Sequence, residues 1–159
     1  MFRRVEVSSL GQTFVDQFFR FAVPSGHDGF VVKREVGSWS TTVSCSYDGA
    51  SCVCFYSEDG LEGNTVHITF AQFTSIVDIL LSHDVQRLGA VYEDSNVLDG
   101  ESYFIKLVCD GVESLAWLGQ PRECGDEKFV AVANALDHII ARLKPGLWDR
   151  LVRRIWWRR

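Results

Sequence analysis

The sequence predicts an α+β fold: an antiparallel β-sheet built from two hairpins and flanking strands, with helices packed on one face as a two-layer sandwich. Two segments rich in β-branched and aromatic residues surround the Asp-Gly dipeptides at residues 48–49 and 110–111. Two further segments, residues 71–83 and 126–144, repeat apolar residues at helical spacing. Hairpins with helices collected against one face give the two-layer arrangement.

The N-terminal part is predicted to hold a helix and then a strand. In residues 12–22, Phe14, Phe18 and Phe21 recur at near-helical spacing, and the Pro-Ser-Gly segment at residues 24–26 ends the pattern. Residues 30–36 (FVVKREV) are rich in β-branched side chains and predict a strand.

The first hairpin is centred on residues 48–49, whose Asp-Gly sequence is typical of a two-residue type I′ turn. Such a turn would place Cys45 opposite Cys52. Alternation along the strands would then put Cys45, Cys52 and Cys54 on one face of the sheet. Core packing is the favoured explanation for these small side chains. A Cys45–Cys52 disulfide or a zinc site completed by His67 are the alternatives, although the C-x6-C-x-C spacing is uncommon for zinc.

The second hairpin is centred on residues 110–111 and follows the same logic. Its turn would place Phe104 opposite Trp117 on one face of the sheet. The other face would carry Tyr103, Ile105, Leu107, Cys109, Val112, Ala116 and Leu118.

Two helices complete the predicted fold. A strand over residues 64–70 leads into the first helix, where Thr69 and Gln72 have the spacing of a capping box. Its apolar stripe consists of Phe73, Ile76, Val77 and Leu80. The second helix carries Phe129, Val132, Ala133, Leu136, Ile140 and Leu143 on one stripe, and the Pro-Gly pair at residues 145–146 ends it.

Charge divides the chain into an acidic body and a basic end. The net charge is −5, yet residues 147–159 (LWDRLVRRIWWRR) hold five arginines and one aspartate, so residues 1–146 carry −9. We predict a single domain over residues 1–146, followed by an amphipathic basic helix over residues 147–159 that packs on that domain. Contact with a membrane surface or with another protein is the alternative role of this helix. The side chains that would make it are Trp148, Arg150, Arg153, Arg154, Trp156 and Trp157.

The cysteines and the apolar runs bear on the compartment. Five cysteines are an odd number, and they include no C-x-x-C pair. No apolar run is long enough for a membrane span, and acidic and basic residues interrupt the N-terminal runs where a secretory signal would need continuity. These features predict a cytoplasmic protein with free thiols. No cofactor and no metal site is predicted.

Acidic side chains gather in two predicted loops, residues 57–64 and 92–101. Solvated turns would explain them, and a face that docks a basic protein is the functional interpretation. The candidate partner-binding residues are Glu58, Asp59, Glu62, Glu93, Asp94, Asp99 and Glu101. An acidic body disfavours nucleic acid as a partner, because phosphate contacts need a basic surface.

These observations favour a small binding protein that acts by stoichiometric protein–protein contact, such as an inhibitor or immunity-type protein for a basic partner. A peripheral membrane or assembly factor anchored by the C-terminal helix is the first alternative. An enzyme with an unrecognised site is the second. The sequence has no G-x-S-x-G, H-E-x-x-H or Walker motif, so an enzyme is the less favoured class.

Overall fold

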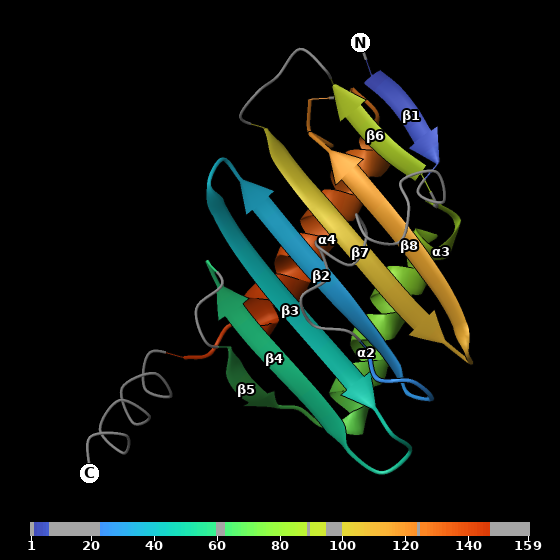
Figure 1. Cartoon of the computed structure of the whole chain (residues 1–159), viewed down its shortest axis with the longest axis vertical. Coiled ribbons are helices and arrows are strands. Elements are labelled where there is room, and N and C mark those ends of the chain that lie inside the picture. The colour runs from blue at the N-terminus through green and yellow to red at the C-terminus, as the bar shows by residue number, and fades with distance from the viewer. Residues whose placement is uncertain are drawn as a thin grey trace.

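A computed structural model describes residues 2–6, 23–59, 63–88, 90–94, 100–123 and 125–146. Two predicted segments, the helix at residues 12–22 and the basic helix at residues 147–159, lie outside the described residues. The remaining elements form one sheet and the helices that cover one of its faces (Figure 1).

Six strands make an open antiparallel sheet in the order β8-β7-β2-β3-β4-β5, which confirms the predicted α+β class. Beyond β8, β6 joins in parallel, and β1 pairs with β6 in the antiparallel sense. The strands are β1 (Phe2–Glu6), β2 (Asp28–Val36), β3 (Trp39–Tyr47), β4 (Cys52–Glu58), β5 (Asn64–His67), β6 (Ala90–Asp94), β7 (Glu101–Cys109) and β8 (Val112–Gly119).

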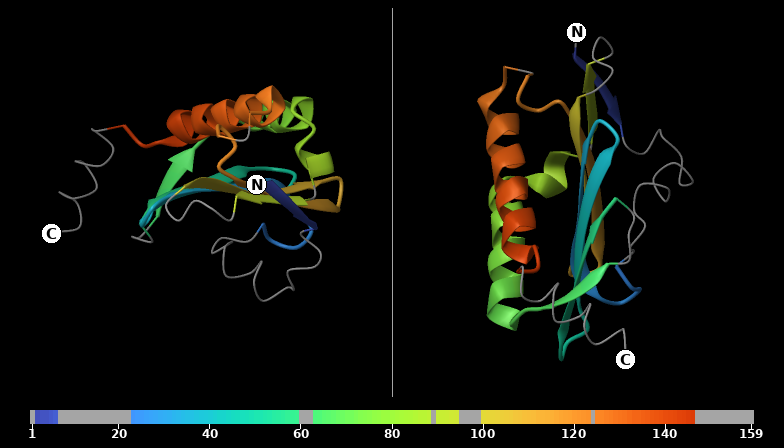
Figure 2. Two further views of the ribbon diagram at one scale, coloured as in Figure 1. Left: turned by 90° about the horizontal axis from the view of Figure 1, so that it is seen from above. Right: turned by 90° about the vertical axis from the view of Figure 1, so that its left-hand side faces the viewer.

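The helices α2 (Phe70–Ser82) and α4 (Glu127–Leu143) lie on the same face of the sheet (Figure 2). The short helix α3 (Val85–Leu88) follows α2 and packs against β8 and β7. Among the described residues, no helix is both long enough and apolar enough to cross a membrane.

Each long helix begins directly after a capping residue. The Thr69 hydroxyl accepts a hydrogen bond from the Gln72 amide N–H, and the Gln72 side chain accepts one from the Thr69 N–H, so the predicted capping box is present. At α4, the Asp126 carboxylate accepts from the Lys128 N–H. Both caps satisfy amide groups that the first helical turn leaves without a partner inside the helix.

The predicted apolar stripes of the helices form one core with the sheet. In α2, Phe73, Ile76 and Leu80 are buried, and Val77 packs against them. In α4 the buried set is Val132, Ala133, Leu136, Ile139, Ile140 and Leu143, so Ile139 joins the predicted stripe, and the predicted Phe129 is only partly buried. Strand residues of even number in β2 and odd number in β3 and β7 meet this core, so alternation fixes which side chains face the helices.

The second hairpin has the predicted register. Cys109 lies opposite Val112, and Phe104 lies opposite Trp117, with the two rings stacked at 5.1 Å between centroids. Asp110 and Gly111 both have positive φ, at 51° and 76°, as a type I′ turn requires.

The first hairpin departs from the predicted register by two residues on β4. Cys45 lies opposite Cys54 instead of Cys52, and Tyr47 lies opposite Cys52. The connection is a four-residue loop, residues 48–51, because the Asp48 carboxylate accepts hydrogen bonds from the N–H groups of Ala50 and Ser51, each at 2.8 Å. A shift of two residues keeps every side chain on its predicted face.

Candidate functional site

The sheet topology brings both acidic segments to one end of the sheet, which we call the acidic end. Strands β2, β4, β6 and β8 finish at this end, and β3 and β7 begin there (upper left in Figure 1). The carboxylate residues at the ends of these strands are Glu58, Asp59, Glu93, Asp94 and Glu101. The described acidic residues of the two segments, which are far apart in sequence, therefore lie at the same end of the sheet.

Two exposed apolar side chains lie at the centre of the acidic end. Val36 and Trp39 face each other across the turn between β2 and β3, and 42 % and 54 % of their surfaces are exposed. Alternation from the core residues Val32 and Val43 places both on the side of the sheet that carries the helices. Since they stay exposed there, α4 does not cover this part of the face.

Carboxylates flank this apolar pair on the same face. Glu101 on β7 lies opposite Val36, and Glu58 on β4 lies opposite Thr41, two residues along β3 from Trp39. Across four neighbouring strands the order is therefore carboxylate, valine, tryptophan and carboxylate.

Glu101 belongs to a half-buried ion cluster that ties the sheet to α4. Its carboxylate accepts hydrogen bonds from Arg34 Nε and from the Tyr103 hydroxyl, each at 2.8 Å, and it also pairs with Arg122. Asp137 of α4 lies 2.7 Å from the same tyrosine oxygen and pairs with Arg122 at 2.6 Å. Two cations face two carboxylates, so the cluster is close to neutral and holds α4 on the sheet.

The cluster changes the pKa values of Glu101, Tyr103 and Arg122. Burial alone would raise the pKa of Glu101, but hydrogen bonds from Tyr103, Arg34 and Arg122 outweigh it and hold the pKa below its usual value. Burial, together with the neighbouring Asp137, raises the pKa of Tyr103. Burial would lower the pKa of Arg122, yet its bonds to Tyr103 and Glu101 raise it. At neutral pH, Glu101 is therefore ionised, Tyr103 is neutral and Arg122 is protonated.

The other flank of the apolar pair is more open to solvent. Glu58 accepts a hydrogen bond from the Tyr56 hydroxyl at 2.5 Å and pairs with Lys144 at 3.1 Å. Asp59 is exposed and exchanges two bonds with the backbone of Ser40: its carboxylate accepts the Ser40 N–H at 2.8 Å, and its own N–H donates to the Ser40 carbonyl at 2.8 Å. These two bonds fix the exposed Asp59 carboxylate against the backbone of Ser40, the residue that follows Trp39.

The remaining predicted site residues are only partly placed. In the ladder between β1 and β6, Glu93 lies opposite Arg3 and Asp94 lies opposite Phe2. Glu62 and Asp99 lie outside the described residues, as does the whole basic segment 147–159 with its arginines and tryptophans. The structure brings Glu58, Asp59 and Glu101 together around Val36 and Trp39, and it uses Glu101 to hold α4 in place.

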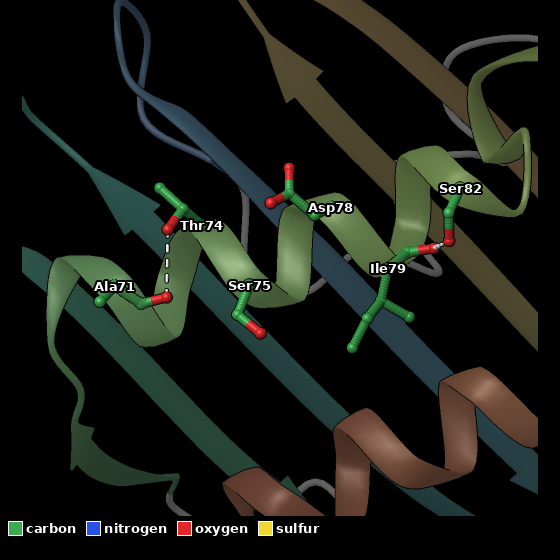
Figure 3. Close-up of a pocket in the computed structure, with 6 residues that line it drawn as sticks. All are labelled: Ala71, Thr74, Ser75, Asp78, Ile79 and Ser82. Carbon is green, nitrogen blue, oxygen red and sulfur yellow. Dashed lines mark hydrogen bonds between the residues drawn. The ribbon is translucent and has the colours of Figure 1, made fainter.

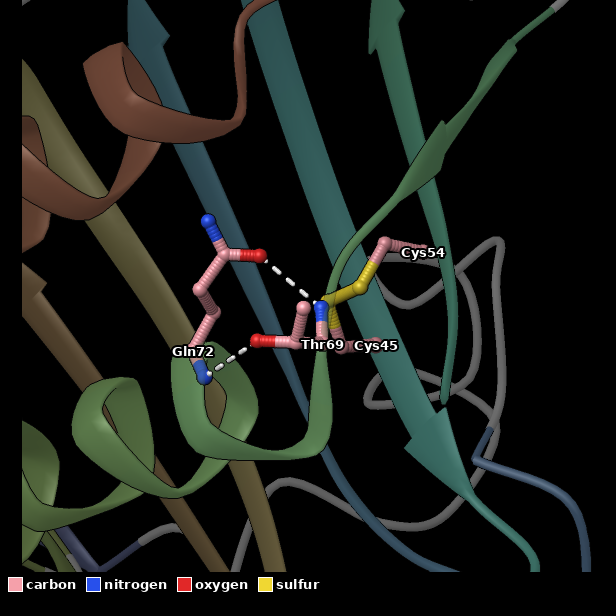
Figure 4. Close-up of a disulfide and its surroundings, with 4 residues drawn as sticks. All are labelled: Cys45, Cys54, Thr69 and Gln72. Atoms are coloured by element: carbon pink, nitrogen blue, oxygen red, sulfur yellow. Dashed lines mark hydrogen bonds between the residues drawn. A yellow bond between two sulfur atoms is a disulfide. The ribbon is translucent and has the colours of Figure 1, made fainter. Parts of the chain in front are cut away.

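Two of the three cysteines predicted on one face of the sheet form a disulfide. Cys45 and Cys54 are joined across β3 and β4, with their Cα atoms 4.1 Å apart, under the start of α2 (Figure 4). The predicted Cys45–Cys52 pairing is wrong, and so is the expectation of free thiols for these two residues, one of the grounds for a cytoplasmic location. Cys52 stays a thiol on the same face, and burial raises its pKa.

The geometry also argues against zinc at this face. His67 lies opposite Val53, whose neighbours in the strand, Cys52 and Cys54, point to the other side of the sheet. Within the described ranges, no group of three or more His, Cys, Asp or Glu side chains is arranged to hold a metal ion.

A shallow depression of about 540 Å³ lies on the exposed side of α2 (Figure 3). All of its lining residues come from this helix: Ala71, Thr74, Ser75, Asp78, Ile79 and Ser82. The hydroxyls of Thr74 and Ser82 donate to the helix's own carbonyls, at 3.1 and 2.8 Å. Polar groups do not converge here on a shared point, so the depression is a weaker candidate than the acidic end.

Comparisons with protein-family models, with curated proteins and with solved structures found no match for this chain.

The sequence did not predict two parts of the site, the hairpin that exposes Trp39 and the ion cluster around Glu101. The turn at residues 37–38 separates two β-rich segments and contains a glycine, so it offered a signal for the hairpin that exposes Trp39. The ion cluster offered none, because Arg34, Glu101, Arg122 and Asp137 are far apart in the chain and only the fold joins them.

Proposed function

We propose that this protein is a binding protein that acts by stoichiometric contact with a basic protein partner, with the acidic end as its contact surface. The observation that carries the proposal is the convergence of Glu58, Asp59 and Glu101 around the exposed pair Val36 and Trp39. An exposed aromatic residue with a charged rim is the usual composition of an energetic centre in a protein interface.

Net charge supports the same choice of partner. Residues 1–146 carry −9, so a basic surface would be attracted over distances of about a Debye length, roughly 8 Å at physiological salt. The rim carboxylates would then set the orientation, and the apolar pair would supply area removed from water. An inhibitor or immunity-type protein for a basic partner is the form of this function that we favour.

The test uses isothermal titration calorimetry with a nona-arginine peptide as the probe, at low and at physiological salt. We expect one-to-one binding that weakens as salt is added. Asp59→Asn keeps a side chain that tolerates the positive φ of 51° and can still accept the Ser40 N–H, so it removes charge alone. We expect it to weaken binding by roughly two- to fivefold, the range for one exposed charge contact.

The matched control is Asp78→Asn, which removes the same charge from the exposed side of α2. It should leave the affinity within error of the wild type. Equal losses in the two variants would show that the peptide senses only net charge. That result, or binding indifferent to salt, would contradict the proposed surface.

A further inference from the structure

We infer that Trp39 is the anchor of this surface and that it seats an arginine side chain of the partner, with the guanidinium over the indole ring and the flanking carboxylates beside it. The inference rests on the proposed function and deepens it, because it names the chemical group of the partner that the acidic end recognises. Four observations carry it.

The first observation is the rigidity of the hairpin that carries Trp39. Trp39 begins β3, which pairs with β2 along all nine positions of both strands, from Val36↔Trp39 to Asp28↔Tyr47. The connecting turn is only two residues long, and Gly37 takes a φ of +57°, which glycine adopts at little steric cost. An aromatic side chain on so short a turn loses little conformational entropy when a partner docks on it.

The second observation is the exposure of the ring together with its neighbour. Val36 provides an apolar floor beside Trp39, and both remain open to solvent on the helix-bearing side of the sheet. The methylene groups of a long basic side chain can cover such a floor while its charged head reaches the rim.

The third observation is the sign of the rim. Carboxylates lie on both flanks, Glu101 beyond Val36 and Glu58 with Asp59 beyond Trp39. Glu101 already pairs with Arg34 and Arg122, and Glu58 pairs with Lys144, so the exposed Asp59 is the carboxylate that we assign to the partner's cation. A purely apolar partner would strip water from these carboxylates and offer nothing in return, which costs free energy. A cation over the ring gains from the ring quadrupole and from the charge of Asp59 together.

The fourth observation is that the neighbouring arginines are already engaged. Arg34 is bonded to Glu101 at 2.8 Å, and Arg122 is paired with Asp137 at 2.6 Å. These pairs neutralise the carboxylates of Glu101 and Asp137, and the exposed Asp59 is bonded to the backbone of Ser40, the residue that follows Trp39. The protein already contains a cation over an aromatic ring on the opposite face, where Lys33 Nζ lies 5.7 Å from the centre of the Phe104 ring.

Arginine is preferred to lysine for a physical reason. Its planar guanidinium stacks flat on an indole and sheds water more readily than a compact ammonium, and it presents a fork of donors that matches a carboxylate. The acidic end should therefore distinguish two ligands of identical charge.

The experiment compares nona-arginine with nona-lysine by titration calorimetry at one salt concentration. The wild type should bind the arginine peptide roughly two- to fivefold more tightly, the range for one exposed contact between a cation and a ring. Trp39→Leu should remove this preference by weakening only the arginine complex. Since the position is exposed, leucine should leave the fold intact, which the melting curve and the circular dichroism spectrum verify.

The matched control is Phe70→Leu, at a ring that is 52 % exposed. This ring packs against Tyr47 with their centroids 4.6 Å apart, at the other end of the sheet. It should keep the arginine preference. A wild type without the preference, or a preference that survives Trp39→Leu, would overturn the inference. If both peptides bind and Asp59→Asn still weakens them, only the role of Trp39 fails. If neither peptide binds, the proposed function fails with it.

Discussion

The two hairpins of the sheet are built around the same dipeptide, yet they turn in different ways. In the hairpin between β7 and β8, Asp110 and Gly111 are the whole turn, and both take positive φ. In the hairpin between β3 and β4, Gly49 has a φ of +98°, but Asp48 keeps a negative φ and directs its carboxylate to the amides of Ala50 and Ser51. One aspartate shapes its turn through its backbone, and the other through its side chain.

The hairpins also differ in what closes them. The first is joined covalently by Cys45 and Cys54, whereas the base of the second is held by the ion cluster at Glu101 and Tyr103. An Asp-Gly dipeptide therefore favours a register but does not fix it. Registers that differ by two residues keep the same side chains on each face, and long-range contacts along the strands select one of them. Three experiments examine this difference, beginning with the largest expected effect.

The largest effect should come from the disulfide. Replacing both residues, as Cys45→Ala with Cys54→Ala, opens a loop with a sequence separation of 9 and should lower the free energy of unfolding by about 2.5 kcal/mol from the unfolded-chain entropy alone. Loss of buried volume would add to this value. Urea unfolding followed by tryptophan fluorescence measures the difference.

Two single variants sharpen the result. Cys109→Ala, in the second hairpin, removes a partly exposed thiol and should cost less than about 1 kcal/mol. Cys52→Ala should also leave stability nearly unchanged, and peptide mapping without reductant should still find the link between Cys45 and Cys54. A large loss of stability in Cys52→Ala would mean that Cys45 pairs with Cys52, as the two-residue turn predicts.

The second effect concerns the base of the other hairpin. Glu101→Gln removes the charge that Arg34 and Arg122 share, so we expect a loss of about 1.5 kcal/mol at pH 7, after allowing for the partial exposure of both arginines. The pKa of Glu101 is depressed in the folded state, so its contribution is complete above the ordinary value of 4.5 and disappears as pH falls through the folded value. The gap between variant and wild type should therefore close below about pH 4.5, as measured by urea unfolding across pH.

Glu58→Gln is the matched control at the end of the first hairpin. Its partner Lys144 is 45 % exposed in its side chain, so this exposed pair should contribute less than about 0.5 kcal/mol. Equal losses in the two variants would mean that the cluster at Glu101 is no more than another surface ion pair.

The smallest effect should come from shortening the first loop. Deleting Ala50 and Ser51 leaves Asp48-Gly49 as a two-residue turn between Tyr47 and Cys52, with every strand pair unchanged. The shorter loop lowers the entropy cost of closure by about 0.6 kcal/mol, which offsets the lost bonds to Asp48. We expect a folded protein that retains the Cys45–Cys54 disulfide, with stability within about 1 kcal/mol of the wild type. Loss of the fold or of the disulfide would show that the four-residue loop itself is required.

Local signals predicted most of the elements correctly. The capping box at Thr69 and Gln72, the stripes of both helices and the register at Asp110-Gly111 each depend on residues close together in sequence. The register was predicted wrongly at Asp48-Gly49 because a two-residue and a four-residue loop both keep the same side chains on the core face. For the site, the acidic loops were visible in the sequence, but their convergence and the exposure of Trp39 were not.

The sequence did not predict β1, β6 or α3, and residues 92–94, which were expected in a loop, belong to β6. By itself, the sequence determined the other described strands and helices, which face of each is apolar, and that the body is acidic. These properties follow from periodicity and composition, which act over a few residues. The tertiary structure decided which strands are neighbours, that Cys45 meets Cys54, and that Glu101 joins Arg34, Arg122 and Asp137. It also placed Val36 and Trp39 between carboxylates from different strands. Such pairings depend on the free energy of the whole packed sheet, because contacts distant in the chain form only when all the elements are in place.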